Sequence, residues 1–526
     1  MTQWSESQLP DASLRGESQR PLTPLVLMGF LGVSTLALAV LTNGNVAASL
    51  APVFGFLAVY TVTKLPLRYL WLLYTGLVMS LDTPAEPFAA GEYHSPLRPL
   101  AVVLSSQLKN VFPMGALVMS GLDLLIIGTL LVHAARRMRE SPLDRDGYVP
   151  APMPLFVANW ACLVAVVLAT LWGVATGGAF RFALWQIQRN IYLPLVFLIA
   201  QAVFPSPANM KPYMRLLIVV ACVRSVLAIW LRFDYPEVEY TTSHSDSMVF
   251  AIVWCYLLIR LLHGATKREK WITWPVLALV AWGMVANDRR LVWVELGISF
   301  VFVYFMSPWN LLKRRFAQIV LGSIPLVVVY IAAGWQSGSG IFKPVGILRS
   351  MADSKSDGST LWRDLENFNL VTTYTHHPIL GTGFGHPYEM AVWMPDITDT
   401  YELEPYVPHN SVVGLWAYTG YIGFNLMWLI PLVGAFVAAR AYYYSTKPFD
   451  RTIALTCFCS VVIYVLQCYG DMGLGSVISV LLLSPPFAMV GKLAVEVGAW
   501  PRRGAAAKLQ GAGLTHPTLA RRPLRQ

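Results

Sequence analysis

Charge is what this sequence has least of. Only 13% of its 526 residues are Asp, Glu, Lys or Arg, whereas 56% are hydrophobic and the mean hydropathy is +0.53. A soluble domain has about a quarter of its residues charged, because water must wet its surface. The composition therefore excludes an ordinary soluble globular protein and predicts an integral membrane protein.

Cysteines are also few, and they lie where they cannot build a disulfide framework or a metal cluster. All six lie within apolar runs, at Cys162, Cys222, Cys255, Cys457, Cys459 and Cys468. No DxD motif or similar carboxylate pair lies near the polar motifs described below, and Glu402 and Glu404 suit a solvated acidic surface. We therefore expect no metal site and no other cofactor.

The net charge of +10 would suit a nucleic-acid partner if the basic residues formed one patch. They alternate instead with hydrophobic runs, and membrane topology explains that pattern more simply. We expect no nucleic-acid partner.

Long apolar runs are abundant. About fourteen of them are long enough to cross the hydrocarbon core of a bilayer as helices. The fold expected is an all-α integral membrane protein, with spans near 23–42, 46–63, 66–82, 113–135, 153–176, 183–204, 212–232, 247–263, 271–286, 291–307, 316–334, 411–439, 452–469 and 473–495.

Basic residues indicate the orientation. With the N-terminus in the cytoplasm, every inner connection carries Lys or Arg, as the positive-inside rule requires. Both termini are then cytoplasmic, and 335–410 forms one long outer loop. The other parts expected are an inner tail 1–22, a first transmembrane block 23–334 of about eleven helices, a second block 411–495 of about three helices and a basic, disordered inner tail 496–526.

Some charged residues break this rule and so indicate a site. They are Arg181, Arg189, Arg289 and Arg290 on the outer side, and Arg224 and Asp123 within predicted spans. An ionisable group in lipid is costly, so it faces a partner or a wet cavity. Arg224 could form a structural ion pair with Asp123, and Arg289 and Arg290 could extend to lipid headgroups. Two adjacent arginines on the disfavoured side favour a functional role at least as strongly.

The outer loop begins with a predicted helix. Leu361, Leu365 and Phe368 recur at helical spacing, with Trp362 and Arg363 between them. Pro378 then ends any helix.

The rest of the outer loop combines glycines with a histidine at a helix start. Gly381, Gly383 and Gly385 allow either a plain turn or a backbone that approaches a ligand closely. Asn410 suits a helix cap. His409 fits either a surface histidine or a base fixed at the membrane surface.

The order of these motifs closely resembles the O-antigen ligase and O-antigen polymerase family. The similarity covers about residues 270–435. It comprises Arg290 with Trp293, Trp362 with Arg363, the run from His377 to Gly385, and His409-Asn410-Ser411 followed by Gly420 and Gly423. The chain has Asp288-Arg289-Arg290 where the family commonly has Ser-Arg-Gly, so either arginine could take the family's role.

The resemblance implies an inverting, metal-independent helical glycosyltransferase of GT-C-like architecture. Such enzymes lie in the bacterial inner (cytoplasmic) membrane with the active site facing the periplasm. They transfer a glycan from undecaprenyl diphosphate to an acceptor glycan (polymerase) or to lipid A–core (ligase), making O-antigen or exopolysaccharide. We slightly favour the polymerase. Membrane lipids, a chain-length regulator and a flippase would be further partners.

This assignment gives the unusual residues chemical roles. Guanidinium groups bind a diphosphate bidentately without a metal, which suits Arg290 first, and then Arg289, Arg189 and Arg224. Imidazole is the natural base near neutral pH, so His409 is expected to activate the acceptor hydroxyl. Further substrate contacts are expected from Trp362, Arg363, His377, Gly381, Gly383, Gly385 and Asn410.

A transporter or flippase for lipid-linked oligosaccharides is the alternative of another class. It should show repeated halves and charges spread through many spans. The sequence shows no matched halves, and its misplaced charges gather near the outer face. A structural anchor for polysaccharide assembly does not account for the outer arginines.

Overall fold

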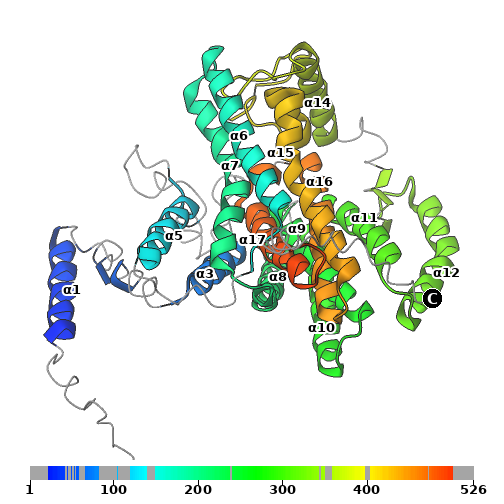
Figure 1. Ribbon diagram of the computed structural model, residues 1–526. Coiled ribbons are helices and arrows are strands. Elements are labelled where there is room, and N and C mark those ends of the chain that lie inside the picture. Colours follow the sequence, from blue (N-terminus) through cyan, green and yellow to red (C-terminus); the bar gives the residue numbers. More distant parts are fainter. Residues whose placement is uncertain are drawn as a thin grey trace, which may run out of the picture. The chain divides into compact units, whose positions relative to one another are not determined.

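The computed structural model in Figure 1 describes residues 22–41, 65–81, 119–138, 149–236, 240–342, 358–396, 403–471 and 473–501, with isolated residues at 44–57, 104 and 345–349. The chain divides into two units, Met1–Pro66 and Leu67–Gln526. Nearly all of the predicted tail 1–22, most of the tail 496–526 and much of the predicted span 46–63 lie outside the described residues.

The described residues form helices and connecting segments, with no β-strand among them. In the first unit, α1 spans Leu22–Leu41. The helices of the second unit are α3 (Leu67–Ser80), α5 (Gly121–Met138), α6 (Met153–Ala175), α7 (Phe180–Val203), α8 (Met210–Asp234), α9 (His244–Leu262), α10 (Lys267–Asn287), α11 (Leu291–Met306), α12 (Leu311–Gly334), α14 (Gly358–His376), α15 (Ser411–Tyr444), α16 (Pro448–Gly470) and α17 (Val477–Glu496).

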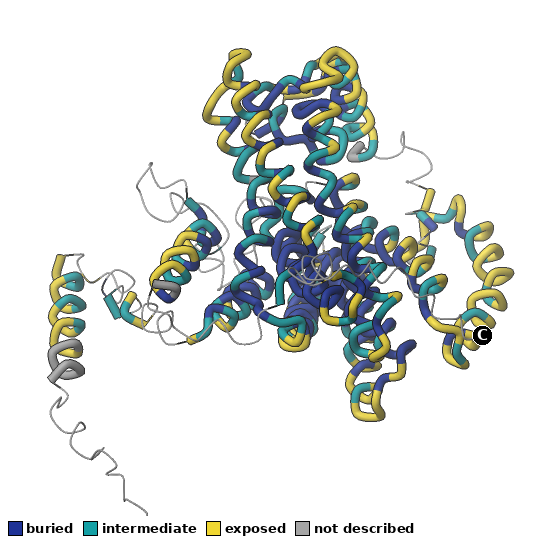
Figure 2. The backbone as a smooth tube through the Cα atoms, viewed as in Figure 1, coloured by how far each residue is buried: buried dark blue, intermediate teal, exposed yellow. Residues whose placement is uncertain are grey.

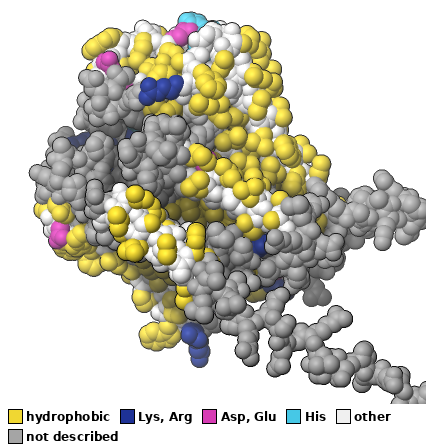
Figure 3. Space-filling model, turned by 90° about the vertical axis from the view of Figure 1, so that its left-hand side faces the viewer, with side chains coloured by type: hydrophobic (Ala, Val, Ile, Leu, Met, Phe, Trp, Pro, Cys, Tyr) yellow, Lys and Arg dark blue, Asp and Glu magenta, His cyan; other side chains and the backbone are white. Residues whose placement is uncertain are grey.

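Several helices have the length and composition of membrane spans. Of the described helices, 7 are long and apolar enough to cross a membrane, namely α6, α8, α9, α12, α15, α16 and α17. Hydrophobic side chains cover most of the described surface in the view of Figure 3. The expectation of an all-α, multi-pass membrane protein is confirmed. Helices also occupy the predicted spans 183–204 and 271–286, but these do not meet the same criteria.

The helices of the second unit differ greatly in burial, as Figure 2 shows. The apolar window of α17 is almost entirely buried, because α7, α15 and α16 pack around it. None of the corresponding window of α12 is buried. An apolar helix window that stays exposed is the pattern of a lipid-facing span.

Antiparallel packing brings particular helix ends together. The ends of α8 and α10 meet where Arg232 Nε donates to the Ala286 carbonyl at 3.1 Å, and α15 and α16 meet where Ser411 Oγ donates to the Asp471 carbonyl at 3.2 Å. These contacts lie at the end of the helix bundle that also holds α14, here called the loop end. All of these ends are predicted to be on the outer side.

The opposite end of the bundle gathers the helix ends predicted to be on the inner side. There Asn310 Nδ2 donates to the Leu262 carbonyl at 2.7 Å, and Tyr442 donates to the Met306 carbonyl at 2.6 Å. We call it the basic end, because Lys267, Arg268 and Lys270 and the run Lys313–Arg315 lie there. The helix order from α8 to α11 and from α15 to α16 therefore agrees with the predicted alternation.

Candidate active site

Arg289 lies in the short turn between α10 and α11 at the loop end. The turn is shaped by Asp288, which ends α10 in the left-handed conformation with φ 59°. The Arg289 guanidinium is buried, lies 3.9 Å from the ring centroid of Tyr240 and donates from Nη2 to the Thr242 carbonyl at 3.3 Å. Its Nη1 lies 2.6 Å from Nε2 of His244. The protein therefore holds this guanidinium firmly in one position.

His244 connects this arginine to a carboxylate on α16. Its Nδ1 lies 3.5 Å from Oδ2 of Asp471, the residue that follows α16. An imidazole with its proton on Nδ1 donates to Asp471 and accepts from Arg289 at Nε2. Because the Asp471 carbonyl accepts from Ser411, polar contacts run from the Arg289 turn to the start of α15. His409 lies two residues before Ser411.

His409 is paired with a carboxylate from the loop helix. Glu366, in the middle of α14, is almost fully buried, and its oxygens lie 3.2 and 3.1 Å from the backbone nitrogen of His409. Its Oε1 also lies 3.2 Å from Nδ1 of the imidazole, whose side chain is 28% exposed. A carboxylate at Nδ1 leaves Nε2 as the nitrogen that can accept a proton. Sequence analysis missed Glu366, because 43 residues separate it from His409.

The surroundings of His409 change its basicity. Burial by itself lowers the pKa of the imidazole, but the hydrogen bond and charge of Glu366, with the nearby Asp471 carboxylate, outweigh it. Arg363 opposes them weakly from the same helix as Glu366. The net result is a His409 pKa above its usual value. A neighbouring carboxylate favours the charged form of an imidazole, which is the cause of this shift.

The remaining predicted arginines differ in accessibility. Arg290, the residue before α11, is half-exposed, whereas its neighbour Arg289 is buried. A Cβ added to Gly470, the last residue of α16, would lie 3.0 Å from the Leu291 side chain. Arg290, the neighbour of Leu291, therefore lies at the end of α16 near Asp471. The backbone of Arg189 belongs to α7, and its side chain lies outside what the structure describes.

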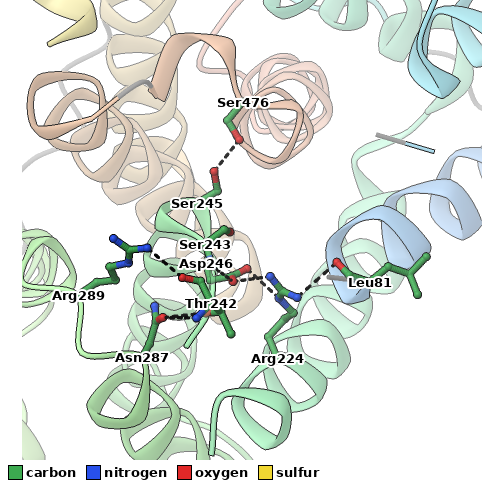
Figure 4. Close-up of polar contacts among 9 residues, drawn as sticks. All are labelled: Leu81, Arg224, Thr242, Ser243, Ser245, Asp246, Asn287, Arg289 and Ser476. Carbon is green, nitrogen blue, oxygen red and sulfur yellow. Dashed lines mark hydrogen bonds and ion pairs between the residues drawn. The ribbon is translucent and has the colours of Figure 1, made fainter. Parts of the chain in front are cut away.

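Arg224 has a structural partner that differs from the predicted one. It donates from Nε to Oδ1 of Asp246 at 2.9 Å and from Nη2 to Oδ2, and both side chains are fully buried. Its Nη1 donates to the Leu81 carbonyl at 3.3 Å (Figure 4). Asp246 also accepts from the Ser243 backbone at the start of α9. This pair joins α8 to α9 and leaves no exposed guanidinium surface for a diphosphate, so the predicted donor contact does not fit.

Asp123 is likewise held by other groups. Its carboxylate accepts from the Tyr192 hydroxyl at 2.8 Å, from Gln188 at 3.2 Å and from the Ser120 hydroxyl at 3.0 Å. The predicted Asp123–Arg224 ion pair is therefore wrong. The idea of a buried structural pair was right for Arg224, but the partner comes from α9.

The three glycines of the loop approach the protein's own backbone. Gly381, Gly383 and Gly385 all have positive φ, at 70°, 83° and 98°. A Cβ on Gly381 would lie 2.3 Å from the backbone of Tyr418, and one on Gly383 would lie 2.3 Å from that of Gly173. The loop is thus clamped between α6 and α15. The glycine backbone does make a predicted close approach, and the groups it approaches are the backbones of α6 and α15.

Hydrogen bonds reinforce this clamp. The Gly383 nitrogen donates to the Tyr418 carbonyl at 2.9 Å, and the Phe384 nitrogen donates to the Ala169 carbonyl at 3.0 Å. Gln186 on α7 accepts from the Gly385 nitrogen at 2.6 Å and donates to the Tyr406 carbonyl at 2.8 Å. The loop that precedes His409 is therefore fixed to three helices.

The other predicted contacts divide into supporting and exposed residues. Asn410 caps α15, accepting from the backbones of Val412 and Val413. His377 is exposed and lies 3.2 Å from Glu389, not from the Glu366 that holds His409. Trp362 and Arg363, at the start of α14, are half-exposed.

One prediction about the loop surface is corrected. Glu404, expected on a solvated acidic surface, is buried and accepts from the Tyr388 hydroxyl at 3.0 Å, and its burial raises its pKa. Tyr388 and Phe384 are core residues of the loop, whereas Trp393 is exposed.

A small cavity of about 50 Å³ opens beside the loop before α15. Gln186 and Asn190 contribute polar groups, and Tyr406, Pro408 and Ser411 form the wall next to His409. The loop end thus combines an oriented histidine, two arginines and a small, mainly apolar recess that includes the amide side chains of Gln186 and Asn190.

No protein-family model and no curated protein matches this sequence.

Proposed function

We propose that this protein is a membrane glycosyltransferase that uses a glycan carried on undecaprenyl diphosphate. The observation that carries the proposal is the His409–Glu366 pair, with its Nδ1 on a buried carboxylate, near a turn that holds Arg289 and Arg290. Base and cations meet at one end of the bundle. A polyprenyl-linked donor would present its diphosphate there, at the membrane surface.

The proposed chemistry needs no metal. Nε2 of His409 takes the proton of an acceptor hydroxyl, whose oxygen attacks the anomeric carbon from the face opposite the diphosphate. The bond between that carbon and the diphosphate oxygen breaks, and undecaprenyl diphosphate leaves with the electron pair. Arg290, half-exposed, would contact this developing charge, while the fixed Arg289 and His244 hold the turn and add a positive field. The configuration inverts in this single displacement.

The finer architecture is part of the same proposal. We infer about fourteen spans and a GT-C-like arrangement, with both termini in the cytoplasm, the loop end in the periplasm and the chain in a bacterial inner membrane. The meeting of the predicted outer ends of α8, α10, α15 and α16 at the loop end supports this topology. The acceptor is another lipid-linked glycan, or lipid A–core if the enzyme is a ligase, and we slightly favour the polymerase.

The decisive experiment is transfer by purified protein from a lipid-linked glycan, with donor binding measured separately. His409→Ala should lose about 10²- to 10⁴-fold in transfer rate while donor binding survives. His377→Ala is the matched control and should keep most activity. Lost binding with an unchanged rate of bound donor would make His409 a ligand contact. Movement of intact donor across vesicles, without a new glycosidic bond, would favour the flippase instead.

A further inference from the structure

A second cavity lies near the basic end, away from the candidate active site. Its volume is about 360 Å³, and helices α9, α10, α11 and the start of α12 line it. Its walls are mainly apolar and include Leu258, Leu277, Phe300 and Phe316. Among the described lining residues, Lys313 alone carries a charge. An apolar cavity of about 150 Å³ already holds benzene and stays free of water. This one is more than twice as large, so hydrocarbon suits it better than water.

The cavity opens toward the lipid. Trp274 on α10 and Leu312 and Phe316 on α12 line it, and all three side chains are exposed. The lipid-facing surface of α12 borders the same opening. An acyl chain can therefore enter sideways from the bilayer.

Lys313 gives the cavity its polarity. The side chain is buried, donates from Nζ to the Ser307 carbonyl at 2.9 Å and lies 4.6 Å from the ring centroid of Tyr304. No carboxylate of the described residues is within ion-pair distance of it. A carbonyl and aromatic rings hold its ammonium group in place. A bound anion would neutralise this buried charge.

The surrounding charges have the same sign. Lys267, Arg268 and Lys270 begin α10, and Arg314 and Arg315 follow Lys313. Glu269, the acid of this group, is paired with Arg260 at 2.8 Å. Basic pockets between helices at the cytoplasmic side of membrane proteins are suited to anionic headgroups.

From the cavity, its opening and Lys313 together we propose a binding site for an anionic phospholipid, with one acyl chain in the cavity and the phosphate-containing headgroup at Lys313. Lipid tails already lie in hydrocarbon, so entering the cavity gains little from the hydrophobic effect. Selectivity therefore comes from the headgroup charge. This site does not depend on the proposed transferase activity.

Native mass spectrometry of the full-length protein tests the site. The protein is titrated with an equimolar mixture of phosphatidylglycerol, which is anionic, and phosphatidylcholine of the same chains, which is zwitterionic. One Lys contact at a membrane surface corresponds to about a fivefold preference. Wild type should retain phosphatidylglycerol over phosphatidylcholine by that factor, and Lys313→Met should bring the ratio close to one.

Two further variants separate the site from general surface attraction. Lys211→Met removes an exposed lysine at the same end and should keep the preference. Ala281→Trp fills the cavity and should reduce retention of both lipids, with Ala281→Leu as the milder version if folding fails. Equal retention of both lipids by wild type, equal effects of Lys211→Met and Lys313→Met, or no effect of filling the cavity would each overturn the proposal.

Discussion

Exchange of Glu366 for Gln tests the most specific feature of the candidate site. The amide keeps the size of the side chain and one acceptor for the His409 backbone, but it removes the charge that stabilises the imidazolium. A hydrogen bond to a charged group contributes about 1.5–3 kcal/mol. If that interaction orients and activates His409 in the transition state, Glu366→Gln should lower kcat/KM by about 10- to 150-fold.

The pH profile distinguishes a base-positioning role from a purely structural one. Because Glu366 raises the pKa of His409, the wild-type rate should fall on the acid side at a pH above the usual imidazole value. In Glu366→Gln this acid limb should move to lower pH, since the imidazole becomes harder to protonate. The assay is transfer from a lipid-linked glycan by purified protein across pH 5–9.

Glu389→Gln is the matched control, because Glu389 faces the exposed His377 instead of His409. Its acid limb should coincide with that of wild type. An unchanged acid limb in Glu366→Gln, with activity retained, would refute the assignment of His409 as a base tuned by Glu366.

The same shift predicts how stability depends on pH. The pKa of His409 is higher in the folded state than in the unfolded state. The His409–Glu366 pair therefore contributes its full stabilisation when the pH is below the pKa of the unfolded state. This contribution is lost as pH rises through the folded pKa. The difference in Tm between wild type and Glu366→Gln should therefore be larger at pH 6 than at pH 9.

The remaining predictions concern the arginines, the glycine clamp and the topology. Arg290→Ala should lower transfer by about 30- to 1000-fold with normal insertion, and Arg290→Lys should restore it in part; near-normal activity in Arg290→Ala would move the role to Arg289. Arg224→Met leaves Asp246 buried without its cation and should cost about 3–5 kcal/mol, seen as a lower Tm, whereas an unchanged Tm with lost donor binding would restore its predicted role. Gly383→Val forces a Cβ onto the Gly173 backbone and should lower the Tm sharply; a stable but inactive variant would favour a ligand contact. A reporter active only in the cytoplasm should be inactive when fused at residue 390, and strong activity there would reject the orientation.

The sequence alone determined the features that depend on local composition and spacing. Apolar runs predicted the helices, and α6, α15 and α16 begin within a few residues of the expected positions. Leu361, Leu365 and Phe368 predicted the loop helix α14, and Asn410 was identified as a helix cap. These features follow from hydrophobic burial and backbone capping, which act over one or two helical turns.

Only the tertiary structure decided which polar side chains are partners. Arg224 could be recognised as a buried charge in need of a counterion, but Asp123 and Asp246 were both available, and helix packing chose the one on α9. Glu366 meets His409 only because α14 folds back onto the start of α15. The glycine run was visible as a turn, yet its contact with Gly173 depends on how α6 packs against α15. Pairings across tens or hundreds of residues depend on the relative rotation and register of packed helices, and a single sequence does not specify these locally.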